Sequence, residues 1–437
     1  MNRDGSNPGH GTQHRAPDAQ GARPGAPPPR GALRLVFDRD FGTFFWGKLL
    51  TSTGVWAHSM VAAIVAFQAS GSALAVGAVS AGQFAPQLLL TPLSGKLTDR
   101  GHAMGQLVAG RALSGLGSGG LALWILAFGV GDGVVGVLPI LASSLIVGCG
   151  FAVGGPAMQS AIPWIIRPGE LARAMALNTA PMTLSRAVGP ALGALLVAHV
   201  SPVAAFGAAA CAHLLFALGL LAVRLPSRTM DGDGADTSLR AAFRHLRADR
   251  PLALLLLGIV AVGVGSEPAT TLVPSMAEEF GGSAALAGWL ASAFGIGAAL
   301  GLPLLAVVRR VLPVLRLGSA GLVLLAVGLA GSAVGHSGPM TLAALGVAGV
   351  GLAFATTGLS TLVQERAPDQ LRGRIMALWL TGFVGSRPLA AGLDGLLADA
   401  ASPAAAFAAS AVLVLAVAWM VRPASVDRPI PGRCSDG

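Results

Sequence analysis

The sequence predicts an all-α membrane protein in which twelve transmembrane helices form two pseudosymmetric six-helix bundles. Composition, the count of apolar stretches and an internal repeat support this fold class. Of the 437 residues, 53% are hydrophobic and 11% are charged, whereas an ordinary soluble domain is about 25% charged. The 61 glycines also fit, because membrane helices tolerate Gly better than soluble helices do. This composition excludes a soluble globular enzyme.

Twelve stretches of the chain are long and apolar enough to span a bilayer, which takes about 20 residues per helix. They cover residues 42–67, 73–95, 106–130, 134–158, 174–198, 202–223, 251–276, 284–307, 314–335, 339–363, 375–398 and 403–421. A polar segment, from Arg224 to Arg250, separates the first six stretches from the last six. We therefore expect a six-helix bundle on each side of a connecting linker.

The expected organisation has five parts. The first 35 residues are polar, contain the stretch PGAPPPRG and have no apolar core of a signal peptide. Such a composition predicts a disordered tail, because it buries too little apolar surface to offset chain entropy. The parts are a tail (1–35), a first bundle (36–224), a linker (225–250), a second bundle (251–422) and a second tail (423–437).

The basic residues predict the orientation in the membrane. The formal net charge is +9, which in a soluble chain would favour nucleic-acid binding. Most of the 29 Lys and Arg residues, however, fall in the tails and in the loops on one side of the predicted spans. The loops on the opposite side carry only acidic charges, at Asp132, Glu278, Glu279 and Asp399. The positive-inside rule then predicts a multi-pass protein of the cytoplasmic (inner) membrane with both termini in the cytoplasm, and no nucleic-acid partner.

An internal repeat relates the two halves. Residues 173–210 align without a gap with residues 374–411, and the match includes rare pairs as well as common apolar residues. The matched pairs include Ser185-Arg186 with Ser386-Arg387, and Ser201-Pro202 with Ser402-Pro403. Two repeated bundles of this kind place a solute path between them, as in alternating-access carriers.

Two motifs resemble the major facilitator superfamily. The segment GKLTDRGHAMG follows the second predicted span and is similar to the family's loop between helices 2 and 3, with Gly95, Asp99 and Arg100 at matching positions. The segment SRAVGPALGA in the fifth predicted span is similar to the Gly-Pro motif of its exporters, with matches at the positions Gly189, Pro190 and Gly193.

This resemblance points to exporters of the drug:proton antiporter type, which include multidrug and siderophore efflux proteins. It implies the major facilitator fold and the export of a small amphipathic molecule in exchange for protons by alternating access. The fourth predicted span has no Arg, which many such exporters carry there. Proton coupling must then rest on other residues.

Two carboxylates in the spans are the candidates for proton coupling, Glu267 and Asp394. An ionised side chain at the bilayer centre costs about 2.5–3.5 kcal/mol on the insertion scale, so such residues usually have a function. The alternative is that each forms a fixed ion pair, Glu267 with an Arg or Lys across the interface between the bundles and Asp394 with a partner near the external helix end.

Other polar residues in the spans are candidates for lining the path. Arg186 and Arg387 are repeat mates, so we expect them to face each other, attracting an anionic solute or holding Glu267 ionised; alternatively, each pins its own bundle. Lys48 and His58 share roughly one helix face, although Lys48 could instead reach the cytoplasmic interface. The remaining cavity candidates are the amide side chains of Gln83 and Asn178.

Arg111 is expected to act in a gate with the loop after the second span. A charge-assisted contact with Asp99 would lock the second and third helices in one state and release them in the other. The Gly residues at 115, 117 and 120 fit a nucleotide-binding spacing, but they lie in a predicted span, where small residues promote helix packing instead.

Three other functions remain as alternatives. An uptake porter would share this fold, a membrane-embedded enzyme would need a catalytic cluster, and a receptor or scaffold would not transport. The sequence contains no paired catalytic carboxylates, no H-E-x-x-H and no Walker loop. Its three cysteines, Cys149, Cys211 and Cys434, are widely spaced and predict neither disulfide framework nor metal site. We expect no cofactor, and a monomer whose partners are a small-molecule substrate, protons and lipid.

Overall fold

The computed structural model describes residues 30–167, 169–223, 239–368 and 370–427, and these ranges contain helices joined by turns and no strand. The expected tail residues 1–29 and 428–437 and most of the connector, 224–238, lie outside the described residues. The first part comprises α1 (Ala32–Val36), α2 (Arg39–Ser70), α3 (Ala73–Leu97), α4 (Ala103–Phe128), α5 (Gly133–Ser160), α6 (Leu171–His199) and α7 (Pro202–Leu220). The second comprises α8 (Leu239–Ala248), α9 (Arg250–Ser266), α10 (Pro268–Thr271), α11 (Val273–Glu279), α12 (Ala284–Val308), α13 (Val314–Ala333), α14 (Gly338–Arg366), α15 (Arg372–Ala400), α16 (Pro403–Met420) and α17 (Pro423–Val426).

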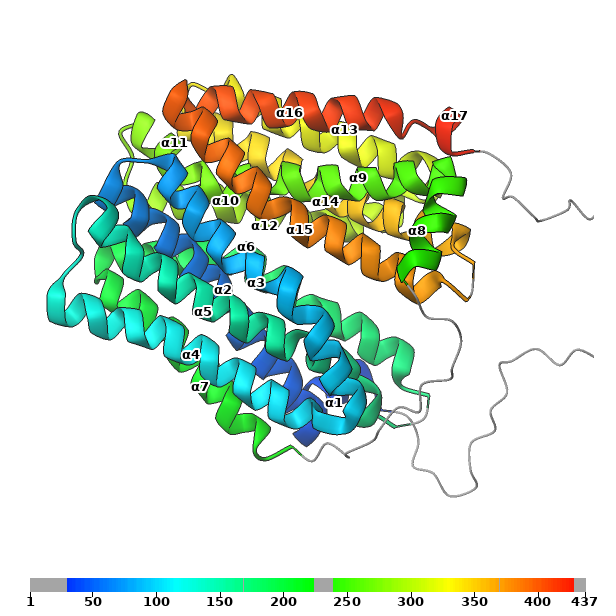
Figure 1. Cartoon of the computed structure of the whole chain (residues 1–437), viewed down its shortest axis with the longest axis horizontal. Helices are drawn as coiled ribbons and strands as arrows, with labels where there is room; N and C mark the ends of the chain where they lie inside the picture. The colour runs from blue at the N-terminus through cyan, green and yellow to red at the C-terminus, as the bar shows by residue number, and fades with distance from the viewer. Residues whose placement is uncertain (1–29, 168, 224–238, 369, 428–437) are drawn as a thin grey trace, which may run out of the picture.

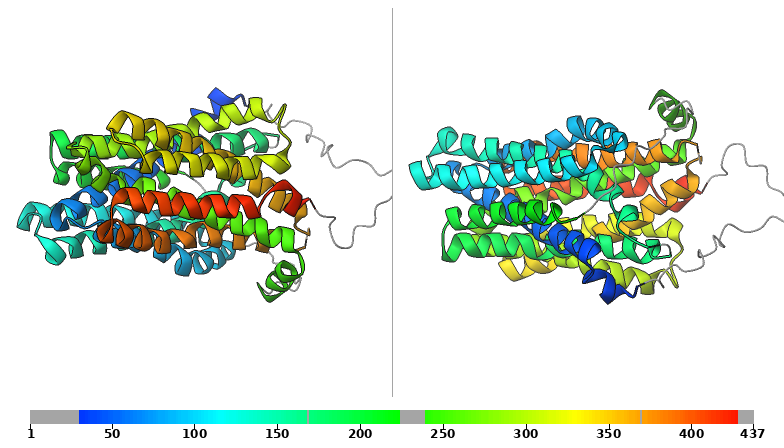
Figure 2. Two further views of the ribbon diagram at one scale, coloured as in Figure 1. Left: turned by 90° about the horizontal axis from the view of Figure 1, so that it is seen from above. Right: turned by 90° about the horizontal axis from the view of Figure 1, so that it is seen from below.

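The long helices run side by side in two groups, as Figure 1 shows. Helices α2 to α7 pack against one another in the first group, and α9 to α16 pack in the second. The short helices α1, α8 and α17 lie at one end of the molecule, which we call the terminal end (Figures 1 and 2). The opposite end, formed by the turns at 71–72, 129–132, 200–201, 280–283, 334–337 and 401–402, is called the loop end.

Within the described residues, ten helical stretches are long and apolar enough to cross a membrane. One of them is a run of 56 residues, Ala73–Phe128, which contains both α3 and α4. The chain reverses between these two helices at Gly101, whose φ of 88° is readily adopted only by Gly. Helix α15 is not among the ten, because its arginines and Asp394 lower its hydropathy.

The internal repeat of the sequence extends to local structure. Ser201 and Ser402 are the N-cap residues of α7 and α16, and each is followed by Pro at the first helical position. Their hydroxyls accept hydrogen bonds from the amides of Ala204 and Ala405, both at 3.1 Å. Because an N-cap hydroxyl satisfies an amide that has no partner in the helix, the repeated Ser-Pro pair starts the last helix of each group in the same way.

The seventh predicted span is not one helix. Residues 251–276 are divided among α9, α10 and α11, with interruptions at Glu267 and Leu272. Pro268 and Pro274 explain these breaks, because proline has no N–H to donate to the preceding turn. The break places Glu267 between two helices.

The disordered tail predicted for residues 1–35 is corrected for its last six residues. Residues 32–36 form α1, and the side chain of Leu35 is fully buried. Arg30 donates to Glu170 through its backbone amide at 2.6 Å and through Nη2 at 2.7 Å, and it also pairs with Asp38. The predicted linker 225–250 is likewise partly helical, since residues 239–248 form α8.

Arg30 changes the proton affinity of both acids at this end. Hydrogen bonds from its side chain lower the pKa of Glu170 to about 2, although burial acts in the opposite direction. The pKa of Asp38 is lowered overall. Burial alone would raise it, but the hydrogen bonds from Arg30 and from the amides of Phe41 and Asp40, together with the charge of Arg30, outweigh burial. The segment before α2 is therefore fixed to the first group by ionic contacts as well as by Leu35.

Candidate functional site

The two groups meet most closely toward the loop end, where glycines bring helix backbones together. Helix α3 packs against α15, and a Cβ atom added to Gly77 would lie 2.2 Å from the carbonyl oxygen of Ala391. A Cβ added to Gly395 would lie 2.5 Å from the carbonyl oxygen of Ala73. No larger residue fits at either position without separating the helices.

The second contact between the groups joins α6 and α12. A Cβ added to Gly288 would lie 2.3 Å from the Cβ of Ala194, and one added to Gly295 would lie 2.2 Å from the carbonyl oxygen of Arg186. These positions lie in the halves of α6 and α12 that are nearer the loop end. The interface between the groups is therefore tight along two helix pairs.

Asp399 links the two groups at the loop end. It lies in the last turn of α15, and its carboxylate accepts hydrogen bonds from the hydroxyl of Ser72 at 2.5 Å and from the amides of Ala73 at 2.7 Å and Leu74 at 3.1 Å. These amides begin α3, and a negative charge stabilises a helix N-terminus. Asp399 therefore holds the second group against the first.

Glu267 is fully buried and contacts both groups. Arg387 on α15 donates through Nε to Oε2 at 2.8 Å, and Thr271 donates to Oε1 at 3.1 Å. Ser80 on α3, in the first group, donates its hydroxyl to the same Oε1. Glu267 thus forms an ion pair, but with an arginine of its own group and not across the interface as predicted. Only its contact with Ser80 crosses between the groups.

Arg186 and Arg387 meet at one aromatic side chain, Trp56 on α2. The guanidinium carbon of Arg186 lies 4.7 Å from the centre of the Trp56 ring and 5.6 Å from that of Phe294. Arg387 lies 6.0 Å from the same Trp56 ring and 3.7 Å from the ring of Phe84. The structure therefore brings the repeat mates together, as their symmetry predicts.

The two arginines differ in their ionic partners. Arg387 is paired with Glu267, while its Nη2 atom has no hydrogen-bond partner within the described residues. Arg186 has neither an ion pair nor a hydrogen bond to its side chain there. Its contacts are the two aromatic rings, so the donors of its guanidinium are free.

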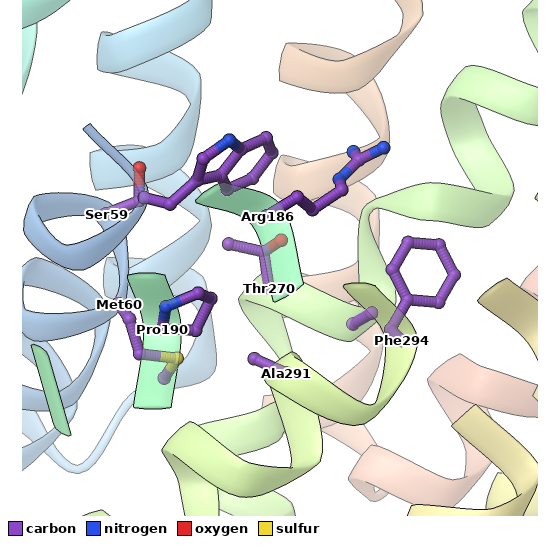
Figure 3. A pocket seen from close by; sticks show the side chains of 9 residues that line it. Ser59, Met60, Arg186, Pro190, Thr270, Ala291 and Phe294 are labelled. Carbon is purple, nitrogen blue, oxygen red and sulfur yellow. The ribbon is translucent and has the colours of Figure 1, made fainter. Parts of the chain in front are cut away.

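A pocket opens beside Arg186 between the two groups. It is narrow in the described conformation, with room for about one water molecule. Its walls come from α2, α6, α10 and α12. The lining residues are Trp56, Ser59, Met60, Arg186, Pro190, Ala269, Thr270, Ala291 and Phe294. Figure 3 shows Arg186 and Phe294 on one side of the pocket and Met60 and Pro190 on the other.

Asp394, the second candidate for proton coupling, is buried and forms no ion pair with an arginine within the described residues. Its Oδ1 accepts a hydrogen bond from Ser410 at 2.9 Å, and its Oδ2 is buried without a partner within the described residues. It forms no ion pair with Arg387 there, although the two lie on the same helix two turns apart. The predicted alternative, an ion pair of Asp394 near the external end of the helix, is therefore not formed in the described residues.

Lys48 and His58 do not form the predicted pair on the path. Lys48 donates to the backbone oxygen of Asn178 at 3.0 Å and to its Oδ1 at 2.6 Å. His58 is fully buried inside the first group, with its Nδ1 3.0 Å from the hydroxyl of Ser118. Both side chains, together with Asn178, connect helices within the first group.

Gln83 lies nearer the interface. Its Oε1 accepts a hydrogen bond from the hydroxyl of Ser59 at 2.8 Å. Gln83, Ser59 and Ser80 line a second, smaller pocket with Thr270 of the other group. Of the polar candidates in the first group, Gln83 is thus placed with the pocket residues.

The predicted contact between Asp99 and Arg111 is not formed in the described conformation. Asp99 is exposed in the turn between α3 and α4, as is its neighbour Arg100, and a Cβ on Gly95 would meet no atom within 4 Å. Arg111 is instead buried within α4, where it donates to the hydroxyl of Thr51 on α2 at 2.9 Å. It lies more than two turns into α4, which explains why its side chain reaches α2 and not the turn.

The Gly-Pro segment of α6 packs on α2. A Cβ on Gly189 would lie 2.7 Å from the Cβ of Trp56, and one on Gly193 would lie 2.8 Å from the carbonyl oxygen of Ala57. Pro190 lies inside the helix and lines the pocket. These small residues let α6 approach α2 and so help to position Trp56 beside Arg186.

Residues 36–428 match the family described as transmembrane secretion effector. The chain belongs to this family of the major facilitator superfamily. It is a multi-pass membrane transporter and not an enzyme. The predicted resemblance is confirmed.

Relatives and solved structures agree with this assignment. The multidrug efflux pump Tap of Mycobacterium tuberculosis is 29% identical over 375 residues, which are 80% of this chain and 86% of that protein. The enterobactin exporter EntS of Escherichia coli is 29% identical over 328 residues, 73% of this chain and 75% of that protein. The fold is similar to that of the nucleoside transporter NupG, with a TM-score of 0.71, 13% identity and coverage of 88% and 100% of the two chains. A bacterial homologue of ferroportin in an inward-facing state gives a TM-score of 0.69 at 16% identity, with coverage of 91% and 100%.

Several residues of the site were not singled out from the sequence. Asp399 was counted only as a loop acid, because its role depends on a helix N-terminus from the other half of the chain. Trp56 and Phe294 lie in apolar stretches, where an aromatic residue is unremarkable. Ser80 also gave no signal, since a single Ser is common in membrane helices.

Proposed function

We propose that the protein exports a small amphipathic molecule across the cytoplasmic membrane by proton antiport, through alternating access between two six-helix bundles. Twelve helices would cross the membrane: the ten apolar stretches with α3 and α4 counted separately, together with α15. The bundles would cover residues 36–224 and 251–422. The two relatives, a multidrug efflux pump and an enterobactin exporter, support the proposal of export.

The distribution of charge supports a cytoplasmic location for the terminal end. The loop end carries Asp132 in a turn and Glu278, Glu279 and Asp399 at the adjoining ends of α11 and α15, and these turns contain no Lys or Arg. The basic residues outside the spans gather at the terminal end. By the positive-inside rule the loop end then faces outward. The tight glycine contacts and Asp399 would close the outer side in the described conformation, so the substrate path would open to the cytoplasm.

The contacts of Glu267 carry the proposal of proton coupling. Its carboxylate holds Arg387 through Oε2 and Ser80 through Oε1, and Ser80 belongs to the other bundle. A proton on Glu267 would remove the charge that holds Arg387 and weaken the contact between the bundles. Proton binding and separation of the bundles at this level would therefore be linked.

Asp394 is the second proposed proton site. Its Oδ2 is buried without a donor, and an ionised carboxylate in that position would leave a charge without compensation. A proton on Oδ2 removes this cost, so we assign Asp394 the protonated form in the described conformation. Release of this proton would require a state in which water or a cation reaches Oδ2.

Proton movement in everted membrane vesicles tests the function. Respiration acidifies the vesicle interior, and a pH-sensitive acridine dye reports the collapse of the gradient when a panel of anionic, neutral and cationic amphiphiles is added. Vesicles with the protein should lose the gradient on addition of a substrate, and Glu267→Gln should abolish this response. Glu278→Gln, at the exposed loop end, is the matched control and should behave as the unchanged protein does. Accumulation of the same compound in intact cells that increases with expression would instead identify an uptake porter.

A further inference from the structure

We propose that the pocket beside Arg186 selects organic anions, with Arg186 binding an anionic head group and the apolar wall holding a flat aromatic body. This assignment of substrate class rests on the proposed function as a transporter, although the binding itself is testable without transport. The candidate ligand is an aromatic carboxylate or a molecule with an equivalent oxyanion. It is distinct from the proton sites because Arg186 does not exchange protons near neutral pH.

The charges around the pocket leave one positive charge uncompensated. Arg387 and Glu267 are the charged groups that act on Arg186. These two are paired with each other at 2.8 Å, so their charges offset one another. Arg186 therefore gives the pocket a net positive charge, and a half-buried cation without an ionic partner favours a counter-ion.

The geometry of Arg186 suits an incoming anion. Its guanidinium lies against the rings of Trp56 and Phe294, at 4.7 Å and 5.6 Å. A ring contact of this kind uses the face of the guanidinium and leaves the N–H groups at its edge available. Those N–H groups have no acceptor within the described residues, and their fork matches a carboxylate with two parallel hydrogen bonds.

The rest of the pocket suits an apolar body. Met60, Pro190, Ala291 and Phe294 form most of its wall, while Ser59 and Thr270 supply the only uncharged polar side chains apart from the Trp56 indole. In Figure 3 Arg186 projects beside the Phe294 ring, opposite Met60 and Pro190. A ligand with its anionic group on Arg186 would stack its aromatic body against these walls once the two groups move apart, because the pocket in the described conformation has room for only about a water molecule. An organic cation of the same shape would be repelled by Arg186.

Three probes of nearly equal shape test this proposal: 2-naphthoate, 2-naphthamide and 2-naphthylmethylammonium. Binding is measured by titration calorimetry on the purified full-length protein in nanodiscs of neutral phosphatidylcholine. We expect naphthoate to bind about tenfold more tightly than the amide, as one charge-assisted pair typically provides, and the ammonium to bind most weakly. Arg186→Gln should reduce naphthoate affinity to that of the amide, and Arg186→Lys should retain most of the preference.

The amide is the internal control for folding. Its affinity should be the same in Arg186→Gln as in the unchanged protein, because the apolar wall is intact. Arg173→Gln, an exposed position on the same helix, should leave all three affinities unaltered. Glu267→Gln leaves Arg387 uncompensated and should increase naphthoate affinity several-fold.

The proposal is overturned if the unchanged protein binds the ammonium as tightly as naphthoate, or if Arg186→Gln keeps the preference for the anion. The first comparison needs no variant, so a folding defect does not obscure it. The proposed function fails separately: anion preference at Arg186 without proton movement in vesicles would refute antiport and leave the binding site standing. Proton-coupled transport of cations but not of anions would refute the anion site at Arg186 and leave proton antiport standing.

Discussion

Replacing Asp399 with Asn should shift the protein toward the conformation that is open at the loop end. Asp399 joins α15 to the first turn of α3 through the Ser72 hydroxyl and the amides of Ala73 and Leu74. The carboxylate can accept from all three donors, whereas the amide of Asn presents one oxygen and one donor. Because these bonds cross between the groups, their loss weakens only the state that is closed at this end.

The size of the effect follows from the charge and its exposure. A negative charge at a helix N-terminus contributes about 0.3–1 kcal/mol at an exposed site, and Asp399 is exposed. Adding the weaker hydrogen bonding of an amide gives a change of about 1 kcal/mol, or roughly a fivefold change in the ratio of closed to open protein.

Distances between spin labels at Val200 and Val334 measure this ratio, since both residues are exposed at the loop end, one in each group. The native residues Cys149, Cys211 and Cys434 are replaced by Ser in this background. Asp399→Asn should increase the population with the longer distance about fivefold relative to the closed one. Asp132→Asn is the control, because Asp132 lies at the same end and makes no side-chain cap contact. Equal distance distributions in all three proteins would refute the role of Asp399.

Three further changes test other parts of the structure. Gly77→Ala should prevent close packing of α3 on α15 and strongly reduce proton-coupled transport in vesicles, because the added Cβ would lie 2.2 Å from the carbonyl oxygen of Ala391. Gly120→Ala is the control and should transport normally, because a Cβ there meets no atom within 4 Å. Equal transport rates in the two variants would contradict the role of the Gly77 contact. Asn178→Ala should destabilise the protein by about 1–3 kcal/mol in thermal unfolding, because the buried Lys48 loses its side-chain acceptor, whereas exposed Thr179→Ala should have little effect. The docking of residues 30–36 should be constant from pH 7 to about pH 5 and weaken as the pH falls from about 4.3, the ordinary Glu value, toward 2, because the pKa of Glu170 is lowered in the folded state. Hydrogen exchange of residues 30–36 measures the change, and Glu170→Gln should increase their exchange already at pH 7. Protection that depends neither on pH nor on this substitution would contradict the ion-pair assignment.

The sequence predicts the helices better than their interruptions. Apolar stretches of about 20 residues locate nearly every long helix, since burial in lipid requires that length. The break at Glu267 was not predicted, although Pro268 was visible, because a proline within a membrane helix can also be accommodated as a bend. The helix at Ala32–Val36 depends on Leu35 and Arg30 contacting distant parts of the first group, and a local composition argument cannot show this.

The candidate site was predictable where the repeat supplied a second observation. Arg186 and Arg387 were paired by symmetry, and the structure brings both to Trp56. The Asp99 and Arg111 contact was argued from proximity along the chain. It is absent from the described conformation, in which Arg111 contacts Thr51 inside the first group. Which face of a helix meets which neighbour is set by tertiary packing, so neither Lys48 nor His58 could be assigned to a path from spacing alone.

Release of protons by the purified protein is the sharpest test of proton antiport through Glu267. A compound that collapses the vesicle gradient is added to the protein in weakly buffered detergent solution, and a pH indicator records the protons released. We expect release from the unchanged protein and from Glu278→Gln, and no release from Glu267→Gln. Equal release from Glu267→Gln and the unchanged protein would contradict a coupling role for Glu267, and no release from any of them would contradict proton antiport itself.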